Sequence, residues 1–342
     1  MTDHKTALNI AILSTAHIHS KSFLENILST NDGRTAHVIW DADTERGARY
    51  AKDYGSRFEP NLETVLNDPS IDGFLILCEN TGHMNLLERV LPIGKPVFCE
   101  KPLVTNTQDL ARVQALVARH NTVLFAGYFQ PFEDQLQGVI ATLQSGVLGK
   151  ITHANYRVAH HAAYGRWFDN PDLQWFVQPA LSGGGALMDL GTHGAHLLVM
   201  LFGPVDRVWA SVGNKSGAYP DVDDFGIAHL EFTSGVLGTL EANWVHRGSS
   251  GLEVHGSQAS IWLDPNLGYV LARSGQDPEP IPPQQTVANR VDRLVAVVRG
   301  ELSQSDLERD FEASCAAVMV IEAAYRSSSQ GVWIELALSE MG

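Results

Sequence analysis

An aspartate and a histidine stand four residues apart near the middle of the chain, behind three consecutive glycines. Gly183-Gly-Gly185 leads into a helical pattern that places Asp189 and His193 on one face. An imidazole titrates near neutrality, and a neighbouring carboxylate can fix its tautomer. Such a pair can remove a hydroxyl proton while a hydride leaves carbon. On spacing alone we prefer a capping aspartate and a core histidine, so the chemical interpretation depends on other motifs.

A lysine follows a strand-like segment in the first third of the chain. Pro96-Val-Phe-Cys99 runs directly into Glu100-Lys101-Pro102. Ligands of open α/β sheets bind at the carboxyl ends of strands, and a proline keeps the residue before it extended. The ammonium of Lys101 can therefore point at a substrate oxygen. Exposed charge pairs are common, so this motif alone is weak evidence.

The turn after the first apolar segment is Ser14-Thr15-Ala16-His17-Ile18-His19. A dinucleotide site usually has glycines here, for a tight turn and a close approach to the pyrophosphate. Those glycines are missing, yet backbone N–H groups at a helix N-terminus still favour an anion. The two histidines either donate to a phosphate or pack without contacting a ligand.

Asp41 ends the second strand-like segment, roughly 25 residues after this turn. A carboxylate there can accept hydrogen bonds from an adenosine ribose and would repel a 2′-phosphate. We therefore expect NAD rather than NADP as the cofactor. A helix-capping role is the alternative, and Asp43 can fill it equally well.

The first third of the chain alternates strand-like and helical patterns. Parallel strands need a helical crossover, and unbroken apolar strands suit a sheet covered on both faces. We therefore expect a Rossmann-type, doubly wound parallel sheet over residues 1–127. The expected strands are Leu8–Leu13, His37–Trp40, Gly73–Leu77, Pro96–Cys99 and Val123–Ala126, with helices near Ser20–Leu28, Thr44–Tyr54, Asn85–Leu91 and Thr107–Arg119.

From about residue 150 the strands follow one another without helices between them. This predicts an α+β domain over residues 128–342 with an open-faced, mostly antiparallel sheet, in which Thr233-Ser-Gly235 is a hairpin turn. Asp277–Pro283 is expected to be a surface loop. The expected strands are Ile151–Ala159, Val205–Val212, Asp224–Phe232, Gly235–Trp244, Gly251–Gly256 and Ser260–Leu263, with helices near Gln135–Ser145, Ala186–Phe202 and Ser305–Ser327.

Composition excludes several classes of protein. A length of 342 residues suits two domains, and a net charge of −15 disfavours nucleic acid and anionic membranes as partners. Residues 1–6 lack the apolar core of a signal peptide, and no uncharged apolar run is long enough to cross a membrane, so we expect a cytoplasmic protein. Cys78, Cys99 and Cys315 have no metal-like spacing and are expected to be structural thiols.

Taken together, these motifs resemble the family of glucose–fructose oxidoreductases and myo-inositol dehydrogenases. The resemblance covers nearly the whole chain. It rests on Glu100-Lys-Pro102 and Asp189-xxx-His193, on Asn80 and His83 after the third strand, on Gly146-Val-Leu-Gly149-Lys-Ile, and on Asp223-Asp-Phe-Gly226 followed by Gly235.

The resemblance implies NAD(P)-dependent hydride transfer to or from a secondary alcohol of a sugar, inositol or related polyol. It makes Lys101, Asp189 and His193 the catalytic group, and it implies assembly as a homodimer or homotetramer through the open sheet. The expected cofactor contacts are Ser14, Thr15, Ala16, His17, Ile18, His19, Asp41, Glu79, Asn80, His83, Glu100 and Lys101. The expected substrate contacts are Tyr128, His160, His161, Arg166, Trp167 and His196.

The chain also departs from the family pattern. The family's Thr-Pro before Asn80 is Cys78-Glu79 here, which places an extra carboxylate on the expected nicotinamide side. The usual aspartate three residues after the catalytic histidine is His196, and an arginine after the last Rossmann strand is replaced within Tyr128-Phe-Gln130.

Three alternatives stay open. Histidines 17, 19, 160, 161, 193 and 196 can converge on a metal, although no recognised spacing supports this and we expect none. A non-catalytic, nucleotide-sensing scaffold of the same fold would tolerate loss of the glycines. An NAD-assisted, redox-neutral glycosidase would use the same residues in its first step.

Overall fold

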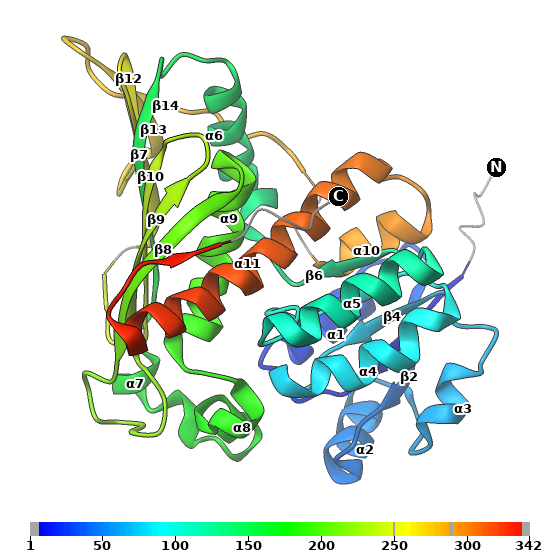
Figure 1. The fold of residues 1–342 in the computed structure, drawn as a ribbon. Helices are drawn as coiled ribbons and strands as arrows, with labels where there is room; N and C mark the ends of the chain where they lie inside the picture. The colour runs from blue at the N-terminus through cyan, green and yellow to red at the C-terminus, as the bar shows by residue number, and fades with distance from the viewer. Residues whose placement is uncertain (1–6, 249, 287–289, 337–342) are drawn as a thin grey trace, which may run out of the picture.

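The N-terminal part of the chain is a parallel sheet with helices on both faces. The computed structural model describes residues 7–248, 250–286 and 290–336 (Figure 1). Six parallel strands lie in the order β3-β2-β1-β4-β5-β6, so the order reverses between β1 and β4. The strands are β1 (Leu8–Leu13), β2 (Arg34–Trp40), β3 (Arg57–Phe58), β4 (Gly73–Ile76), β5 (Val97–Cys99) and β6 (Leu124–Ala126). The helices are α1 (Ser20–Ser29), α2 (Thr44–Asp53), α3 (Leu62–Leu66), α4 (His83–Val90) and α5 (Thr107–His120).

This confirms the expected Rossmann-type sheet, and the physical reason is visible in its strands. Ile10, Leu75, Phe98 and Phe125 are buried on one face, while alternate residues of the same strands are buried on the other. The reversal of strand order opens a crevice at the carboxyl ends of β1 and β4, where ligands of such sheets bind.

The second sheet has nine strands in the order β14-β13-β12-β11-β7-β10-β9-β8-β15. Of the described pairings only β7 with β10 is parallel, so the expected mostly antiparallel sheet is confirmed. Gly235 N–H donates to Phe232 O in the predicted hairpin turn. The strands are β7 (Ile151–Ala159), β8 (Val205–Gly213), β9 (Phe225–Phe232), β10 (Leu237–Asn243), β11 (Gly251–Gly256), β12 (Ala259–Asp264), β13 (Gly268–Arg273), β14 (Glu279–Pro280) and β15 (Ile334–Glu335).

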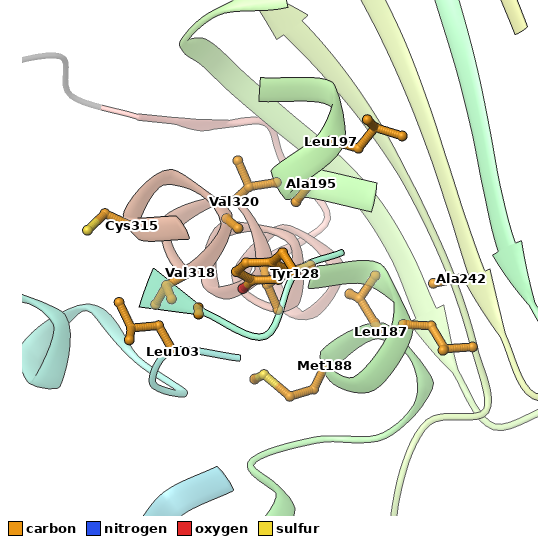
Figure 2. Close-up of a cluster of buried hydrophobic side chains, with 14 of the residues drawn as sticks. Leu103, Tyr128, Leu187, Met188, Ala195, Leu197, Ala242, Cys315, Val318 and Val320 are labelled. Atoms are coloured by element: carbon orange, nitrogen blue, oxygen red, sulfur yellow. The ribbon is translucent and has the colours of Figure 1, made fainter. Parts of the chain in front are cut away.

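Helices cover one face of this sheet. In Figure 1, α6 (Asp134–Gln144), α9 (Thr192–Phe202) and α11 (Gln304–Gln330) lie on its side nearer the N-terminal sheet. Figure 2 shows part of the buried hydrophobic core, to which Ala195 of α9, Val320 of α11, Tyr128 and Leu187 belong. The composition of Pro179–Phe202 would suit a membrane span, but 78% of its most apolar window is buried inside the protein. This stretch is therefore part of the core.

Several elements differ from the sequence-based expectation. The helix expected over Ala186–Phe202 begins as a π-helical turn, η6 (Leu187–Gly191), before α9. The loop expected over Asp277–Pro283 contains the short strand β14. Other strands and helices not predicted are β3, α3, α7 (Ala162–Gly165), α8 (Pro179–Ser182), β13, β15 and α10 (Arg290–Val298). Helix α10 lies in the range expected for the second domain but packs on α1 and beside β5.

A buried charge cluster fixes α10, α9 and α11 to one another. Asp310 on α11 is 0% exposed, and it accepts hydrogen bonds from His196 Nε2 at 2.9 Å and from Arg293 Nη2 at 3.0 Å. The guanidinium of Arg293 also lies 3.6 Å from the centre of the Phe132 ring. Burial lowers the pKa of Arg293, and Asp310 opposes that effect. The carboxylate therefore compensates a charge that has little access to water.

We expect Asp310→Ala to destabilise the protein by about 3–5 kcal/mol, because removing one partner of a buried ion pair leaves the other uncompensated. Chemical denaturation at neutral pH measures this loss. Glu308→Ala, an exposed position on the same helix, is the control and should change the free energy of unfolding by less than about 0.5 kcal/mol. Equal effects of the two substitutions would contradict the prediction.

Candidate active site

Lys101 joins the two domains through an ion pair with Asp189. Its Nζ lies 2.6 Å from Asp189 Oδ1 and 2.8 Å from the Asp189 backbone oxygen. The Lys101 side chain is 3% exposed. Trp244, at 0% exposure, donates from Nε1 to Asp189 Oδ2 at 3.0 Å. Burial raises the pKa of Asp189, but the Lys101 charge, His160 and the hydrogen bonds from Lys101 and Trp244 together hold it below its ordinary value.

The π-turn is the local device that makes this pair possible. In a π-turn the regular i to i−4 ladder is interrupted, so a backbone carbonyl can bond elsewhere. Here Asp189 O accepts from Lys101. Asp223 holds the start of the turn, accepting from Gly185 N–H and Leu187 N–H, both at 2.8 Å. A Cβ at position 185 would lie 1.9 Å from Asp223 O, so only glycine allows this approach.

A cavity of about 210 Å³ lies beside the ion pair. Aromatic groups form much of its wall, and Trp167 stacks on His160 with ring centres 4.7 Å apart. Gln130 is 5% exposed and, among the described residues, its Oε1 has no hydrogen-bond partner. The lining is Ile18, His19, Lys101, Phe129, Gln130, Val158, His160, Trp167, Phe168, Phe176, Asp189, Leu190 and His193.

His193 reaches this cavity as a neutral, enclosed imidazole. It is 3% exposed, its ring meets Tyr128 and Phe129 edge to face, and Nδ1 has no partner among the described residues. Burial lowers its pKa well below the ordinary value, and Lys101 adds to this. The structure shows no hydrogen bond between His193 and Asp189, whose two oxygens face Lys101 and Trp244. The expectation that Asp189 orients His193 is therefore replaced: Asp189 orients Lys101.

Glu100 lies at the centre of a second buried cluster. It is 0% exposed, with His19 Nδ1 at 3.0 Å and Arg290 Nη1 at 3.2 Å from Oε1. Burial raises its pKa, but His17, Arg290 and His19 together hold it well below the ordinary range. A Cβ at position 127 would lie 2.5 Å from Glu100 Oε2, which explains Gly127.

His17, His19 and Glu100 also come close enough for a metal, with ligand atoms within 4.8 Å of one another. Arg290 supplies the positive charge at this place, since its Nη1 contacts both His19 and Glu100. The guanidinium makes the cluster a poor metal site. The other four histidines of the convergence considered from sequence do not join this cluster.

The turn expected to bind pyrophosphate keeps the required backbone shape without glycine. Ser14 has a φ of 73°, in the left-handed region that usually favours glycine. Its Oγ accepts from Ala16 N–H at 3.3 Å. Thr15 donates from N and Oγ1 to Asp41 Oδ2, at 2.7 and 2.8 Å. Ser14, Thr15, Ala16 and His17 are each at most 2% exposed, whereas Ile18 is 41% exposed.

Both carboxylate oxygens of Asp41 accept hydrogen bonds from neighbouring residues of the chain. Arg46 binds both carboxylate oxygens, with Nη2 2.7 Å from Oδ1 and Nε 3.0 Å from Oδ2. Asp43 N–H donates to Oδ1 as well. Glu79 lies 3.6 Å from Arg46. The carboxylate expected at the end of β2 is therefore present, but the guanidinium of Arg46 offsets its negative charge.

Asn80 and His83 lie on the next βα connection. Asn80 Nδ2 donates to Ser182 O at 2.8 Å. His83 is 0% exposed and contacts Pro102 O and Cys78 O at 2.8 and 3.3 Å. His83 thus supports the loop that carries Glu100 and Lys101.

The remaining sequence-predicted residues divide between the cavity and other places. His160 and Trp167 line the cavity. Tyr128 and His196 do not, because they stack in the core with ring centres 4.2 Å apart. Arg166 points to Asp169 and Ala218 O at the surface, and His161 lies edge-on to Trp167. All three cysteines are buried and free, as expected.

Sequence reasoning missed Trp244, Phe176 and Arg290. Trp244 is the last residue of a predicted strand, so its placement at a sheet end was a usable signal. Phe176 and Arg290 lie more than 70 residues after the Glu100-Lys101-Pro102 motif that they approach in the fold. No local sequence pattern identifies either residue.

The chemistry of these groups matches a dinucleotide in kind: a left-handed βα turn, a carboxylate ending β2 and a lysine ending β5. Protein groups already contact part of this set: Trp175 Nε1 donates to Ala16 O at 3.1 Å, and Asp41 accepts from Arg46 and Thr15. Strand order and charged groups at the strand ends define a two-domain α/β protein of the dinucleotide-binding type.

Family comparisons agree with this class. Residues 8–128 match the model of the oxidoreductase family with an NAD-binding Rossmann fold, and residues 136–262 match the GFO/IDH/MocA C-terminal domain. The chain belongs to the Gfo/Idh/MocA family of oxidoreductases.

Individual relatives are distant in sequence. An uncharacterised oxidoreductase of Rhizobium meliloti is 25% identical over 95% of this chain and 98% of its own length. Levoglucosan dehydrogenase of Pseudarthrobacter phenanthrenivorans is 24% identical over 66% of this chain and 63% of its own length. The structure of an inositol dehydrogenase homologue from Azotobacter vinelandii, complexed with NAD+, is 18% identical and superposes with a TM-score of 0.83 over 97% of this chain and 98% of that one. At this identity the superposition shows the fold.

We expect stability to fall as the pH drops below about 6.5, because burial lowers the pKa of His17, His83 and His193 in the folded protein while the unfolded chain still binds their protons. Each such histidine contributes up to about 1.4 kcal/mol per pH unit between its folded pKa and its unfolded pKa. The contribution is complete above the unfolded pKa and is lost on the acid side.

Denaturation midpoints between pH 5 and 8 measure this slope. His193→Asn should flatten it, whereas His229→Asn, at an exposed position, should leave it unchanged. An unchanged slope in His193→Asn would show that folding does not shift the pKa of this imidazole, which would contradict the prediction.

Proposed function

We propose that this chain is an NAD-dependent dehydrogenase that oxidises a secondary alcohol of a sugar, inositol or related polyol, or reduces the corresponding ketone. The observation that carries the proposal is the buried Lys101–Asp189 pair, which shares one cavity with the neutral imidazole of His193. A scaffold has no physical need for an enclosed charge pair beside an unpaired base.

The three groups have separate roles in this proposal. Neutral His193 accepts the hydroxyl proton, which an imidazole of lowered pKa can do at physiological pH. The Lys101 ammonium stabilises the charge that develops on the substrate oxygen. Asp189 holds Lys101 in place and keeps its charge balanced. The cofactor supplies the hydride acceptor when it is bound.

The cavity supports a small, uncharged substrate. Its volume of about 210 Å³ suits a single ring, and its wall carries aromatic faces together with Gln130 and His160. No arginine lines it among the described residues, and the Lys101 charge is balanced by Asp189. The levoglucosan and inositol dehydrogenases among the relatives act on such compounds by their names.

Other expectations belong to the same proposal. We expect NAD to be favoured over NADP only modestly, because Arg46 offsets the charge of Asp41. We also expect a cytoplasmic homodimer or homotetramer that associates through the face of the second sheet not covered by helices, with no nucleic-acid or membrane partner. Light scattering tests the assembly state.

The proposal is tested by turnover with NAD across a panel of sugars and polyols, followed by three variants. His193→Asn should lose about 10²–10⁴-fold in turnover, because a general base contributes that much. Lys101→Ala should also lose most turnover, and Lys101→Arg should not fully restore it, since a guanidinium differs in shape from an ammonium. Asp189→Asn should impair turnover to a similar or smaller degree.

Single-turnover reduction of NAD, with cofactor saturating, separates the chemical step from binding. The double variant Lys101→Ala/His193→Asn should fall far short of the product of the single effects, because the groups act together. Turnover within about threefold of the parent in both single variants would refute the assignment.

Trp244 is a positioning residue in this proposal, since it acts through Asp189. Trp244→Phe keeps the ring but removes the Nε1–H that donates to Asp189 Oδ2. Losing a donor to the charged form raises the pKa of Asp189, so the acid limb of the kcat profile should move to higher pH while KM changes little. Trp262→Phe, on β12, is the control. A fall in kcat with an unshifted profile would mean that Trp244 only supports packing.

A further inference from the structure

Arg290, the first residue of α10, links two strand ends of the N-terminal sheet. Helix α10 follows the strands β7 to β14 of the second sheet in the sequence, but it lies against the N-terminal domain (Figure 1). Arg290 Nη1 donates to Glu100 Oε1, after β5, and to Gly127 O, after β6, both at 3.2 Å. The Arg290 side chain is 12% exposed, so both bonds form largely out of water.

We propose that Arg290 is a positioning residue for the chemical step, because it holds Lys101 through Glu100 and His193 through Phe129. The inference rests on the proposed function, in which Lys101 stabilises the developing oxyanion and His193 accepts the proton. Among the described residues, Arg290 does not line the cavity, so it acts through its neighbours.

The link to Lys101 runs through the two oxygens of Glu100. Burial raises the pKa of Glu100, but its histidine and arginine neighbours more than offset this, so the group is a carboxylate that only accepts hydrogen bonds. Oε1 faces Arg290 and His19, while Oε2 accepts from the backbone N–H of Lys101 at 3.0 Å. The guanidinium therefore restrains the rotation of the carboxylate, and the carboxylate restrains the backbone from which the Lys101 side chain extends.

The link to His193 runs through Phe129. The guanidinium carbon of Arg290 lies 4.9 Å from the centre of the Phe129 ring and 4.8 Å from that of Phe23. Phe129 in turn meets His193 edge to face, with ring centres 5.2 Å apart. Because Arg290 also bonds to Gly127 O, two residues earlier, it restrains both the backbone and the ring of Phe129. His193 Nδ1 has no hydrogen-bond partner among the described residues, so the orientation of this imidazole depends on packing.

Arg290 also acts on His193 through its charge. Burial lowers the pKa of His193, and the positive charges of Lys101 and Arg290 lower it further. Glu100 acts in the opposite direction, and His19 adds a smaller lowering. Removing the Arg290 charge should therefore raise the protonation midpoint of His193.

Two substitutions at position 290 separate geometry from charge. Arg290→Lys keeps the positive charge that balances Glu100, but an ammonium lacks the planar fork that stacks on rings while it bonds to two acceptors. Turnover in Arg290→Lys should fall roughly tenfold to hundredfold, because small displacements of reacting groups cost that much, while KM stays within about twofold. Arg290→Met should lose at least as much turnover and should also raise the His193 midpoint. Steady-state kinetics and ring-nitrogen NMR of His193 measure these effects.

Arg299→Met is the matched control. Arg299 lies at the other end of α10 and pairs with Asp32 at 3.1 Å. Asp32 precedes β2, so this ion pair is at the opposite edge of the sheet from the strand ends that carry Lys101. The substitution removes a partly buried arginine from the same region without touching the site. It should change neither turnover nor the His193 midpoint.

The double variant Glu100→Gln/Arg290→Met tests whether Arg290 only balances the buried charge of Glu100. With both charges removed, neither is left uncompensated, so stability should rise above that of Arg290→Met. Turnover should stay low, because the link through Gly127 and Phe129 is still broken.

The outcomes distinguish this inference from the proposed function. Turnover in Arg290→Met within about threefold of the parent overturns the positioning role and leaves the proposed function intact. An unshifted His193 midpoint, or recovery of turnover in the double variant, has the same consequence. If Arg290→Met does not fold, Arg290→Lys decides the question, and unchanged turnover in it overturns the role. Absence of turnover in the parent overturns the proposed function, and the NMR titration then decides on its own whether Arg290 acts on His193.

Discussion

The buried ion pair between Lys101 and Asp189 is the constraint on which the rest of the site depends. It spans the two domains, since Lys101 follows β5 of the parallel sheet and Asp189 lies before α9 of the second domain. Two charges removed from water are stable only with good geometry and satisfied remaining atoms. The π-turn supplies a free carbonyl to Lys101, and Trp244 satisfies the second oxygen of Asp189. Gly185 and Asp223 then hold the turn where this geometry is possible.

The same pair sets the state of His193. Burial alone disfavours an imidazolium, and the Lys101 charge on the same cavity disfavours it further. The site therefore contains one persistent positive group, its fixed counter-ion and one neutral base. Two groups that differ in charge at the same pH can serve different roles toward a hydroxyl, one stabilising an oxyanion and one taking a proton. Asp189 has no oxygen left to orient the histidine, so Phe129 and Tyr128 restrain the ring by packing.

Sequence patterns predicted the elements better than the partners of individual side chains. Unbroken apolar segments such as Leu8–Leu13 and Gly73–Leu77 predicted the parallel sheet because both faces of it are buried. The four-residue spacing of Asp189 and His193 predicted that Asp189 orients His193. This is wrong, because Asp189 lies in the π-turn and its oxygens bind Lys101 and Trp244 instead. Asp41 was correctly expected at the end of β2, but no local pattern predicts that Arg46 and Thr15 saturate it. Arg290 contacts Glu100 across 190 positions of sequence, and such contacts are decided by packing.

The missing glycines acquire a physical meaning in this arrangement. Ser14 adopts the left-handed backbone at a cost that glycine would avoid, yet its hydroxyl accepts from Ala16 N–H and receives Arg46 at 3.4 Å. A glycine turn would leave its amides to water or to a ligand, whereas this turn supplies its own acceptors. The great majority of buried backbone donors in native proteins are paired, because an unpaired one costs free energy. In the proposed function, dinucleotide binding would therefore be an exchange, in which phosphate oxygens take over amides from Ser14 and Asp41. The affinity for a dinucleotide would then depend on how weakly those internal bonds hold, more than on the number of donors offered.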